Sequence, residues 1–75
     1  MKKFKVTFFN HETLKKSVTR FVFAWDYNNH CWDITIKTNY GERTDTYTGD
    51  PMVLINHYID CRMRKNEYAT IKSFA

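Results

Sequence analysis

The stretch Thr19–Thr38 constrains the fold of this chain more than any other, because it carries the alternating pattern of a β-hairpin. Large apolar side chains recur at every second position on both sides of a short polar segment, and a period of two is typical of a strand. Within that segment Asn28 and Asn29 suit a two-residue type I′ turn, since asparagine tolerates positive φ. This turn predicts a register in which Trp25 lies opposite Trp32.

The predicted register sorts the hairpin side chains onto two faces, because successive residues of a strand point to opposite sides. One face is apolar and is expected to form the core of a sheet: Phe21, Phe23, Trp25, Trp32, Ile34 and Ile36. The other face is small, polar or charged: Arg20, Val22, Ala24, Asp26, Cys31, Asp33, Thr35 and Lys37. On this second face, Arg20 is expected directly opposite Lys37.

Two more strands are expected around this hairpin. In the segment Lys3–Phe9, phenylalanine or valine alternates with lysine or threonine as far as Phe8, as in a half-buried strand, and Phe9 breaks the pattern. After Lys37 the chain turns at Asn39–Glu42, and Gly41 suits the αL position of a glycine bulge. With this bulge, Thr44, Thr46 and Thr48 face the core and Arg43, Asp45 and Tyr47 face out; without it the assignment reverses. This strand lacks a large aliphatic residue, so we expect it at a sheet edge.

The pair Asp50 and Pro51 predicts the start of a helix, because Asp caps free N–H groups and Pro suits the first helical position. An apolar stripe for packing on the sheet follows: Leu54, Ile55, Tyr58, Ile59 and Arg62. The last turn is expected to hold basic residues, with an asparagine cap after them: Arg62, Arg64, Lys65 and Asn66. Residues Tyr68–Phe74 then predict a fifth strand, with a continued helix as the alternative. The order β-β-β-β-α-β predicts an α+β domain over residues 1–75, an antiparallel sheet of four or five strands with one helix on one face.

Composition narrows the class of protein. The 75 residues include six Phe, five Tyr and two Trp but only two Gly and one Pro, which favours a small compact core over disorder. The start Met1–Lys5 lacks the apolar run of a secretory signal, and no apolar stretch approaches the roughly 20 residues of a membrane span. Two cysteines are too few for a disulfide framework. We expect a cytoplasmic protein.

Charge and exposed aromatics suggest two classes of binding partner. Like charges at Arg20 and Lys37 repel each other and invite an anion between them. A single-stranded nucleic acid on a basic and aromatic sheet face would use Lys15, Lys16, Arg20, Lys37 and Arg43, with Tyr40 or Tyr47 stacking a base. The acids Asp26 and Asp33 at the other end of this face oppose a uniformly basic surface.

A protein partner is the other class, and the sequence alone favours it. The aromatic residues exceed what one small core encloses, and aromatic anchors with arginine dominate many interfaces. The residues expected to bind a protein are Phe9, Tyr27, Tyr40, Arg43, Tyr47 and Tyr68. Compact proteins of this composition resemble, in general style, accessory products of bacteriophages or mobile elements, many of which inhibit a host factor. An edge strand also permits a homodimer.

Catalysis and metal binding have weaker support. The chain has no phosphate-binding glycine loop and no hydrolase or metalloprotease motif, so we expect no enzyme and no cofactor. A small basic nuclease built from His11, His57, Tyr58 and Arg62 is the remote alternative. For a metal, His57 and Cys61 share a helix face and His30 adjoins Cys31, but adjacent strand residues point apart. We therefore expect no metal site.

Overall fold

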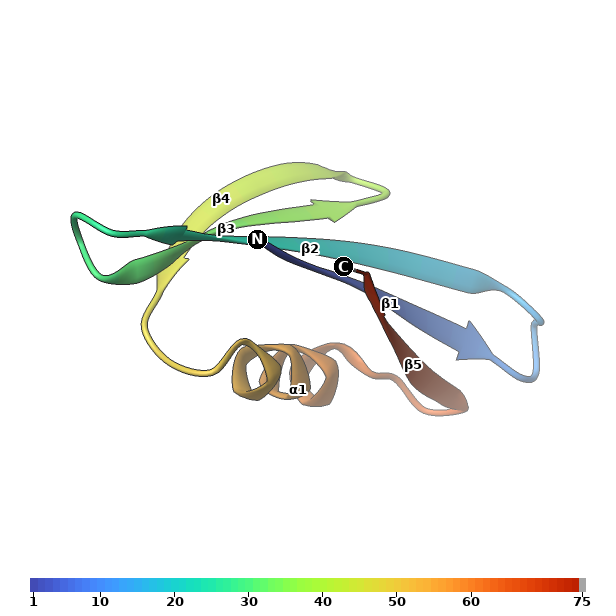
Figure 1. The fold of residues 1–75 in the computed structure, drawn as a ribbon. Helices are drawn as coiled ribbons and strands as arrows, with labels where there is room; N and C mark the ends of the chain where they lie inside the picture. Colours follow the sequence, from blue (N-terminus) through green and yellow to red (C-terminus); the bar gives the residue numbers. More distant parts are fainter. Residues whose placement is uncertain (75) are drawn as a thin grey trace.

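A computed structural model describes residues 1–74 and shows a five-stranded antiparallel sheet with a single helix across one face (Figure 1). The elements are β1 (Lys2–Asn10), β2 (Lys16–Asp26), β3 (Cys31–Thr38), β4 (Gly41–Tyr47), α1 (Pro51–Arg62) and β5 (Glu67–Phe74). The strand order is β4-β3-β2-β1-β5. The predicted α+β class is thus confirmed, β4 lies at an edge as expected, and β5 pairs with β1 on the far side.

The core lies between α1 and the sheet face that α1 covers, here called the inner face; the opposite face is the outer face. The buried apolar residues come from three strands and the helix: Phe4, Val6, Phe8, Phe21, Phe23, Ile34, Ile36, Ile55 and Ile59. Burial of Trp25 was predicted and is wrong, because its side chain is 37% exposed. It is the last inner-face residue of β2 before the loop, and its ring meets the edge of Trp32 at a centroid distance of 5.0 Å.

The register of the β2–β3 hairpin is confirmed pair by pair, but its turn differs from the prediction. Trp25 lies opposite Trp32 and Asp26 opposite Cys31, so the loop has four residues, Tyr27–His30. The Asp26 carboxylate accepts hydrogen bonds from the N–H groups of Asn28 and Asn29 at 2.9 and 3.2 Å. Positive φ falls on His30, at 53°. The type I′ turn is therefore wrong, because the aspartate satisfies these N–H groups in a longer loop.

The glycine bulge expected between β3 and β4 is also wrong. Thr38 lies opposite Gly41 and Ile36 opposite Arg43, so no residue is inserted. Gly41 has a φ of 143°, outside the αL region that this bulge requires. The assignment of faces therefore reverses: Arg43, Asp45 and Tyr47 lie on the inner face, and Thr44 and Thr46 on the outer face. Thr48 follows the end of β4.

The helix starts where the sequence predicts and ends earlier. Asp50 is the N-cap and accepts a hydrogen bond from the Met52 N–H at 2.9 Å. At the other end the helix stops at Arg62, and the C-cap is Met63. The placement of Arg64, Lys65 and Asn66 in or at the last turn is therefore wrong. Asn66 instead adopts a φ of 68° in the connection to β5, which turns the chain back along β1 as a strand and not as a continued helix.

Candidate nucleic-acid interface

Basic residues from four neighbouring strands lie opposite one another on the outer face. Lys5 of β1 pairs with Arg20 of β2 and with Lys72 of β5. Arg20 pairs in turn with Lys37 of β3. Since directly opposite residues project from the same face, the four side chains form a line across the strands, here called the basic row. Neighbouring strands lie about 4.8 Å apart, so the row is roughly 14 Å long.

The basic row contains no counter-charge. Arg20, Lys37 and Lys72 are exposed and Lys5 is half-buried. None of the four forms an ion pair with a residue among 1–74, and Glu42 of β4, opposite Lys37, marks the end of the row. Like charges directly opposite each other destabilise a sheet by up to about 1 kcal/mol per pair. The basic row therefore lowers the stability of the free protein.

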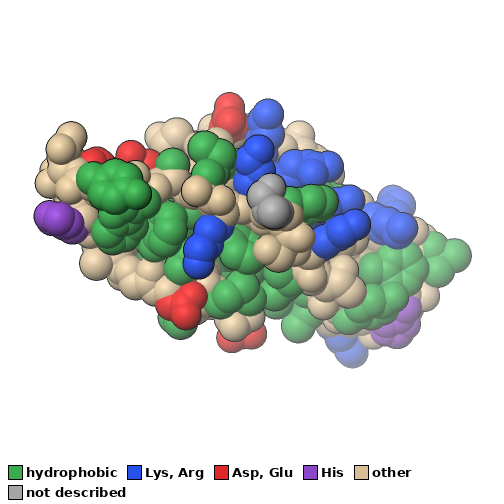
Figure 2. All heavy atoms as spheres, viewed as in Figure 1, with side chains coloured by type: hydrophobic (Ala, Val, Ile, Leu, Met, Phe, Trp, Pro, Cys, Tyr) green, Lys and Arg blue, Asp and Glu red, His purple; other side chains and the backbone are tan. Residues whose placement is uncertain are grey.

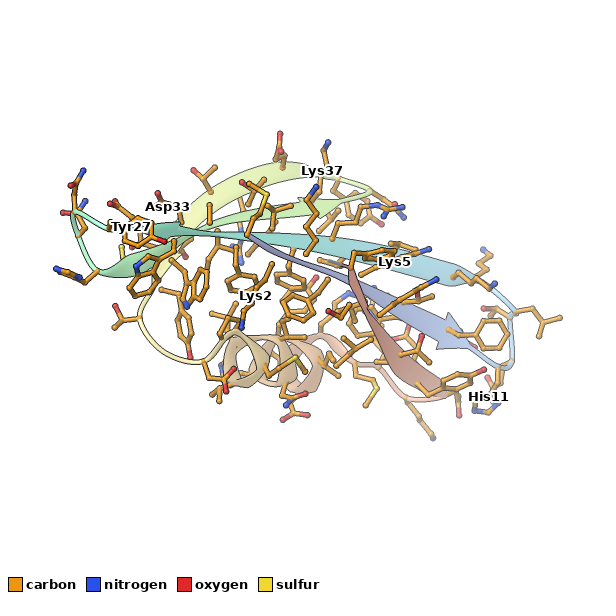
Figure 3. All side chains as sticks on the ribbon, viewed as in Figure 1. Lys2, Lys5, His11, Tyr27, Asp33 and Lys37 are labelled. Atoms are coloured by element: carbon orange, nitrogen blue, oxygen red, sulfur yellow. The ribbon has the colours of Figure 1, made fainter. Side chains whose placement is uncertain are left out.

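The figures place the basic row away from the helix. In Figure 3, Lys37 and Lys5 lie on the side of the sheet opposite to α1. Figure 2 shows lysine and arginine side chains gathered over the upper right part of the molecule, with acidic atoms at its upper left. Among residues 1–74 the single helix lies on the inner face (Figure 1), so the basic row stands on a sheet face that no helix covers.

Aromatic rings flank the basic row along β1 and β5. On one side Phe9 lies opposite Tyr68, with ring centroids 5.4 Å apart. On the other side Phe74 lies beside Lys72, whose Nζ is 5.4 Å from the ring centroid. Tyr68 and Phe74 are 51% and 38% exposed. Exposed rings next to cations are the combination that holds single-stranded nucleic acids, with phosphates on the cations and bases on the rings.

Two shallow hollows adjoin Arg20. The larger, of about 340 Å³, is lined by Lys3, Phe4, Arg20, Phe21, Val22 and Phe74. The smaller, of about 200 Å³, is lined by Val18, Arg20, Lys37, Thr38 and Asn39. Both hollows thus adjoin the basic row at Arg20, and the smaller one also at Lys37.

The predicted nucleic-acid residues are only partly brought together. Arg20 and Lys37 lie opposite each other as predicted. Lys16 joins the same face, opposite Phe9, and Lys15 lies in the preceding loop. The placement of Arg43 near this patch is wrong, because Arg43 lies opposite Ile36 on the inner face.

Sequence reasoning missed Lys5 and Lys72, which double the number of basic residues from the predicted two to four. The alternation of Lys3–Phe9 already placed Lys5 on the outside of its strand. The sequence did not show that β1 pairs with β5, because these two strands are far apart in the sequence.

The residues predicted to bind a protein do not share one surface. Tyr27 and Tyr40 are highly exposed but lie in the loops at opposite ends of β3, roughly 25 Å apart for a strand of this length. Phe9 and Tyr68 lie on the outer face, while Arg43 and Tyr47 lie on the inner face.

An acidic group marks the far end of the outer face, near the β2–β3 loop. Asp26, Cys31 and Asp33 bring their oxygen and sulfur atoms within 4.8 Å of one another. The side-chain hydrogen bond from Asn29, with backbone bonds from the loop, lowers the pKa of Asp26. Burial and the two carboxylates raise the pKa of the Cys31 thiol. The lowered pKa favours the charged form of Asp26 and the raised pKa favours the protonated thiol of Cys31, so this end is a poor source of thiolate for a metal.

The other candidate ligands and catalytic residues are spread out. On α1, His57 Nε2 lies 3.6 Å from Cys61 Sγ. His30 is in the β2–β3 loop and His11 in the loop after β1, which Figure 3 places at the far end of the molecule. Tyr58 and Arg62 of the nuclease alternative are engaged elsewhere: the Tyr58 hydroxyl bonds to a threonine of β2 at 2.9 Å, and Arg62 pairs with a glutamate of β5 at 3.4 Å.

Among residues 1–74, no helix has the length and apolarity needed to cross a membrane. The chain matches no protein-family model and shows no significant similarity to a curated protein or to a solved structure. The chemistry of the outer face is therefore the basis for a functional proposal.

Proposed function

We propose that the outer face binds single-stranded nucleic acid, and that the protein acts by this contact without catalysing a reaction. The observation that carries the proposal is the basic row, in which Lys72, Lys5, Arg20 and Lys37 follow one another across four strands without an acidic neighbour until Glu42. Three successive like-charge pairs weaken a small fold. A polyanion lying along the row would turn that repulsion into attraction.

Phosphate binding along the row has a measurable signature. Each phosphate neutralised on a single strand releases counterions, which lowers the slope of log K against log salt by about 0.7. Four contacts predict a slope of about −3. Binding should therefore be strong at low ionic strength and fall steeply as salt is added.

A single strand suits this surface better than a duplex. Tyr68 and Phe74 are exposed on either side of Lys72, and an unpaired base can stack on such a ring. The bases of a duplex are stacked on each other and leave no face for these rings. Each stacked base is worth about 1–3 kcal/mol, so the rings would add affinity that is independent of salt.

The acidic end limits the site. Asp26 and Asp33 lie on the outer face at the end near the β2–β3 loop, and their charge repels phosphate. The nucleic-acid strand is therefore expected to cross β5, β1, β2 and β3 along the basic row. It is not expected to run parallel to these β-strands toward the β2–β3 loop.

The decisive experiment is a fluorescence anisotropy titration of labelled single-stranded DNA and RNA over a series of salt concentrations. Replacing Lys5 and Arg20 together with glutamine should weaken binding to every sequence and reduce the magnitude of the salt slope by about 1.4. The matched control is Arg64→Gln with Lys65→Gln, which removes one arginine and one lysine from the exposed connection after α1.

The control variant distinguishes binding at the basic row from attraction by the overall positive charge of the protein. If both double variants lose the same affinity and slope, the basic row is not a binding site. If the parent does not bind single strands even at low salt, where screening is weakest, the proposal is wrong.

A protein partner is the second candidate, supported by the aromatic group on the inner face near the start of α1. Trp25 is partly exposed and packs on Trp32, whose Nε1 donates to the Gly49 carbonyl at 3.1 Å. Exposed tryptophan is a frequent interface anchor. A protein captured by the parent after nuclease treatment, and lost with Trp25→Ala, would support this candidate.

A cytoplasmic location belongs to the same proposal. Cys31 and Cys61 are free, and thiols stay reduced in that compartment.

A further inference from the structure

The free edge of β4 presents unpaired backbone groups. β4 ends the sheet order, and the Thr46 N–H is bonded to the Asp45 side chain at 2.8 Å. This N–H is thus directed away from the β3 ladder. Because the direction of backbone groups alternates along an antiparallel strand, Thr44 and Glu42 direct their N–H and C=O groups to the same free edge.

β4 carries two opposite charges that form no ion pair within residues 1–74. Arg43 and Asp45 are exposed on the inner face and lie opposite Ile36 and Ile34, two core residues of β3. Neither forms an ion pair with a residue among 1–74. An arginine and an aspartate on one edge strand can satisfy each other when a second identical strand runs antiparallel.

We propose that β4 pairs antiparallel with β4 of a second copy of this chain, with Thr44 opposite Thr44. In this register Arg43 lies opposite the second copy's Asp45, and Asp45 opposite its Arg43. Glu42 lies opposite the second copy's Thr46. The N–H of that threonine then exchanges its hydrogen bond to the Asp45 side chain of its own chain for one to the neighbouring β4. All seven residues of Gly41–Tyr47 are then paired. Glu42, Thr44 and Thr46, which direct backbone groups to the free edge, lie opposite the same three residues of the second copy.

Charge excludes the neighbouring registers. Moving the second strand by two residues in one direction places Asp45 opposite Asp45, and in the other direction Arg43 opposite Arg43. Like charges directly opposite destabilise a sheet pair, and both shifts shorten the overlap. A shift by one residue would mismatch the backbone groups and the faces.

At its Gly41 end, β4 has space for the Tyr47 side chain of the second copy. Gly41 lies opposite the second copy's Tyr47 in the proposed register, and an aromatic ring across from a glycine stabilises a strand pair. A hollow of about 330 Å³ adjoins Gly41 and is lined by Ile36, Thr38, Tyr40, Gly41, Glu42 and Arg43. Apart from Gly41 and its two chain neighbours, no heavy atom of residues 1–74 lies within 4 Å of the position that a Cβ at Gly41 would occupy.

The other free edge is unsuited to a second copy. β5 carries Lys72 of the basic row, so pairing there would bring two basic rows together. At β4 each row ends in Glu42, and the two rows stay apart while both outer faces point to the same side. The pairing itself does not depend on nucleic-acid binding.

Sedimentation analysis over a range of protein concentrations tests the pairing. The parent should show a concentration-dependent dimer. Arg43→Asp leaves acidic residues at both positions 43 and 45, and Asp45→Arg leaves arginine at both. Each variant alone then places like charges opposite each other and should associate at least about tenfold more weakly than the parent. An equimolar mixture of the two should form a heterodimer, since every opposite pair is then complementary. Arg64→Asp, the control for charge reversal, should dimerise like the parent.

Circular dichroism shows whether the two variants fold, as exposed β4 substitutions should. A parent that stays monomeric at all concentrations overturns the proposal. So do single variants that dimerise like the parent, which would place the interface elsewhere, and a mixture that does not associate, which would rule out this register.

Discussion

Replacing Arg20 with glutamine should stabilise the free protein, because Arg20 takes part in two of the three like-charge pairs of the basic row. Each such pair is worth up to about 1 kcal/mol, so relieving two should raise the free energy of unfolding by about 0.4–2 kcal/mol at low salt. Arg20 is exposed, so little packing is lost. A change of 1 kcal/mol corresponds to about 4–8 °C in Tm for a chain of this size.

The assay is thermal and urea denaturation of parent and variant at low and at high salt. The stabilisation should disappear at high salt, because the Debye length falls from about 30 Å at 0.01 M to about 3 Å at 1 M. Arg20→Lys keeps the charge and should leave Tm unchanged at both salt concentrations. A variant that is less stable than the parent at low salt, or a difference that is equal at low and high salt, would refute electrostatic repulsion in the row.

Three other perturbations test separate parts of the structure. Asp50→Ala should lower the free energy of unfolding by about 0.5–2 kcal/mol through loss of the helix cap, measured by urea denaturation; an unchanged midpoint would contradict the cap. Phe74→Leu should weaken single-strand binding by about 1–3 kcal/mol in anisotropy titrations without changing the salt slope, whereas a changed slope would assign the ring an electrostatic role. The pKa of Asp26 is lower in the folded protein than in the unfolded chain, so its contribution to stability is present above the unfolded pKa and is lost as pH falls through the folded pKa. NMR titration of the Asp26 carboxyl should give a midpoint that rises in Asn29→Ala, and an equal midpoint in both would contradict the assigned hydrogen bond.

Local patterns predicted the parts of the fold that depend on neighbouring residues. The alternation around Trp25 and Trp32 was enough for the β2–β3 register, although the turn was wrong, because a four-residue loop and a two-residue loop at its centre bring the same residues opposite each other. Asp50 and Pro51 predicted the helix start from chemistry confined to one turn. In each case the interacting groups are close in sequence.

The errors arose where the result depends on backbone geometry or on distant segments. At Gly41 a single inserted residue decides which face every later side chain occupies, and composition alone did not distinguish the two arrangements. The basic row was half missed for another reason: Lys5 and Lys72 meet only because the first and last strands pair. Which strands become neighbours is decided by packing of the whole chain.

The pairing of β1 with β5 also bears on the order in which the protein can assemble during synthesis. Of the five described strands β1 is translated before the others, yet one of its two neighbours, β5, is translated after the other four. The consecutive hairpins of β1 to β4 join segments close in the chain and can form early. The contact of Lys3 with Phe74 joins strands that are far apart in the sequence and must come later. Until then an edge of β1 stays open and the basic row lacks Lys72. The nascent chain therefore acquires its complete outer face only after β5 has been translated.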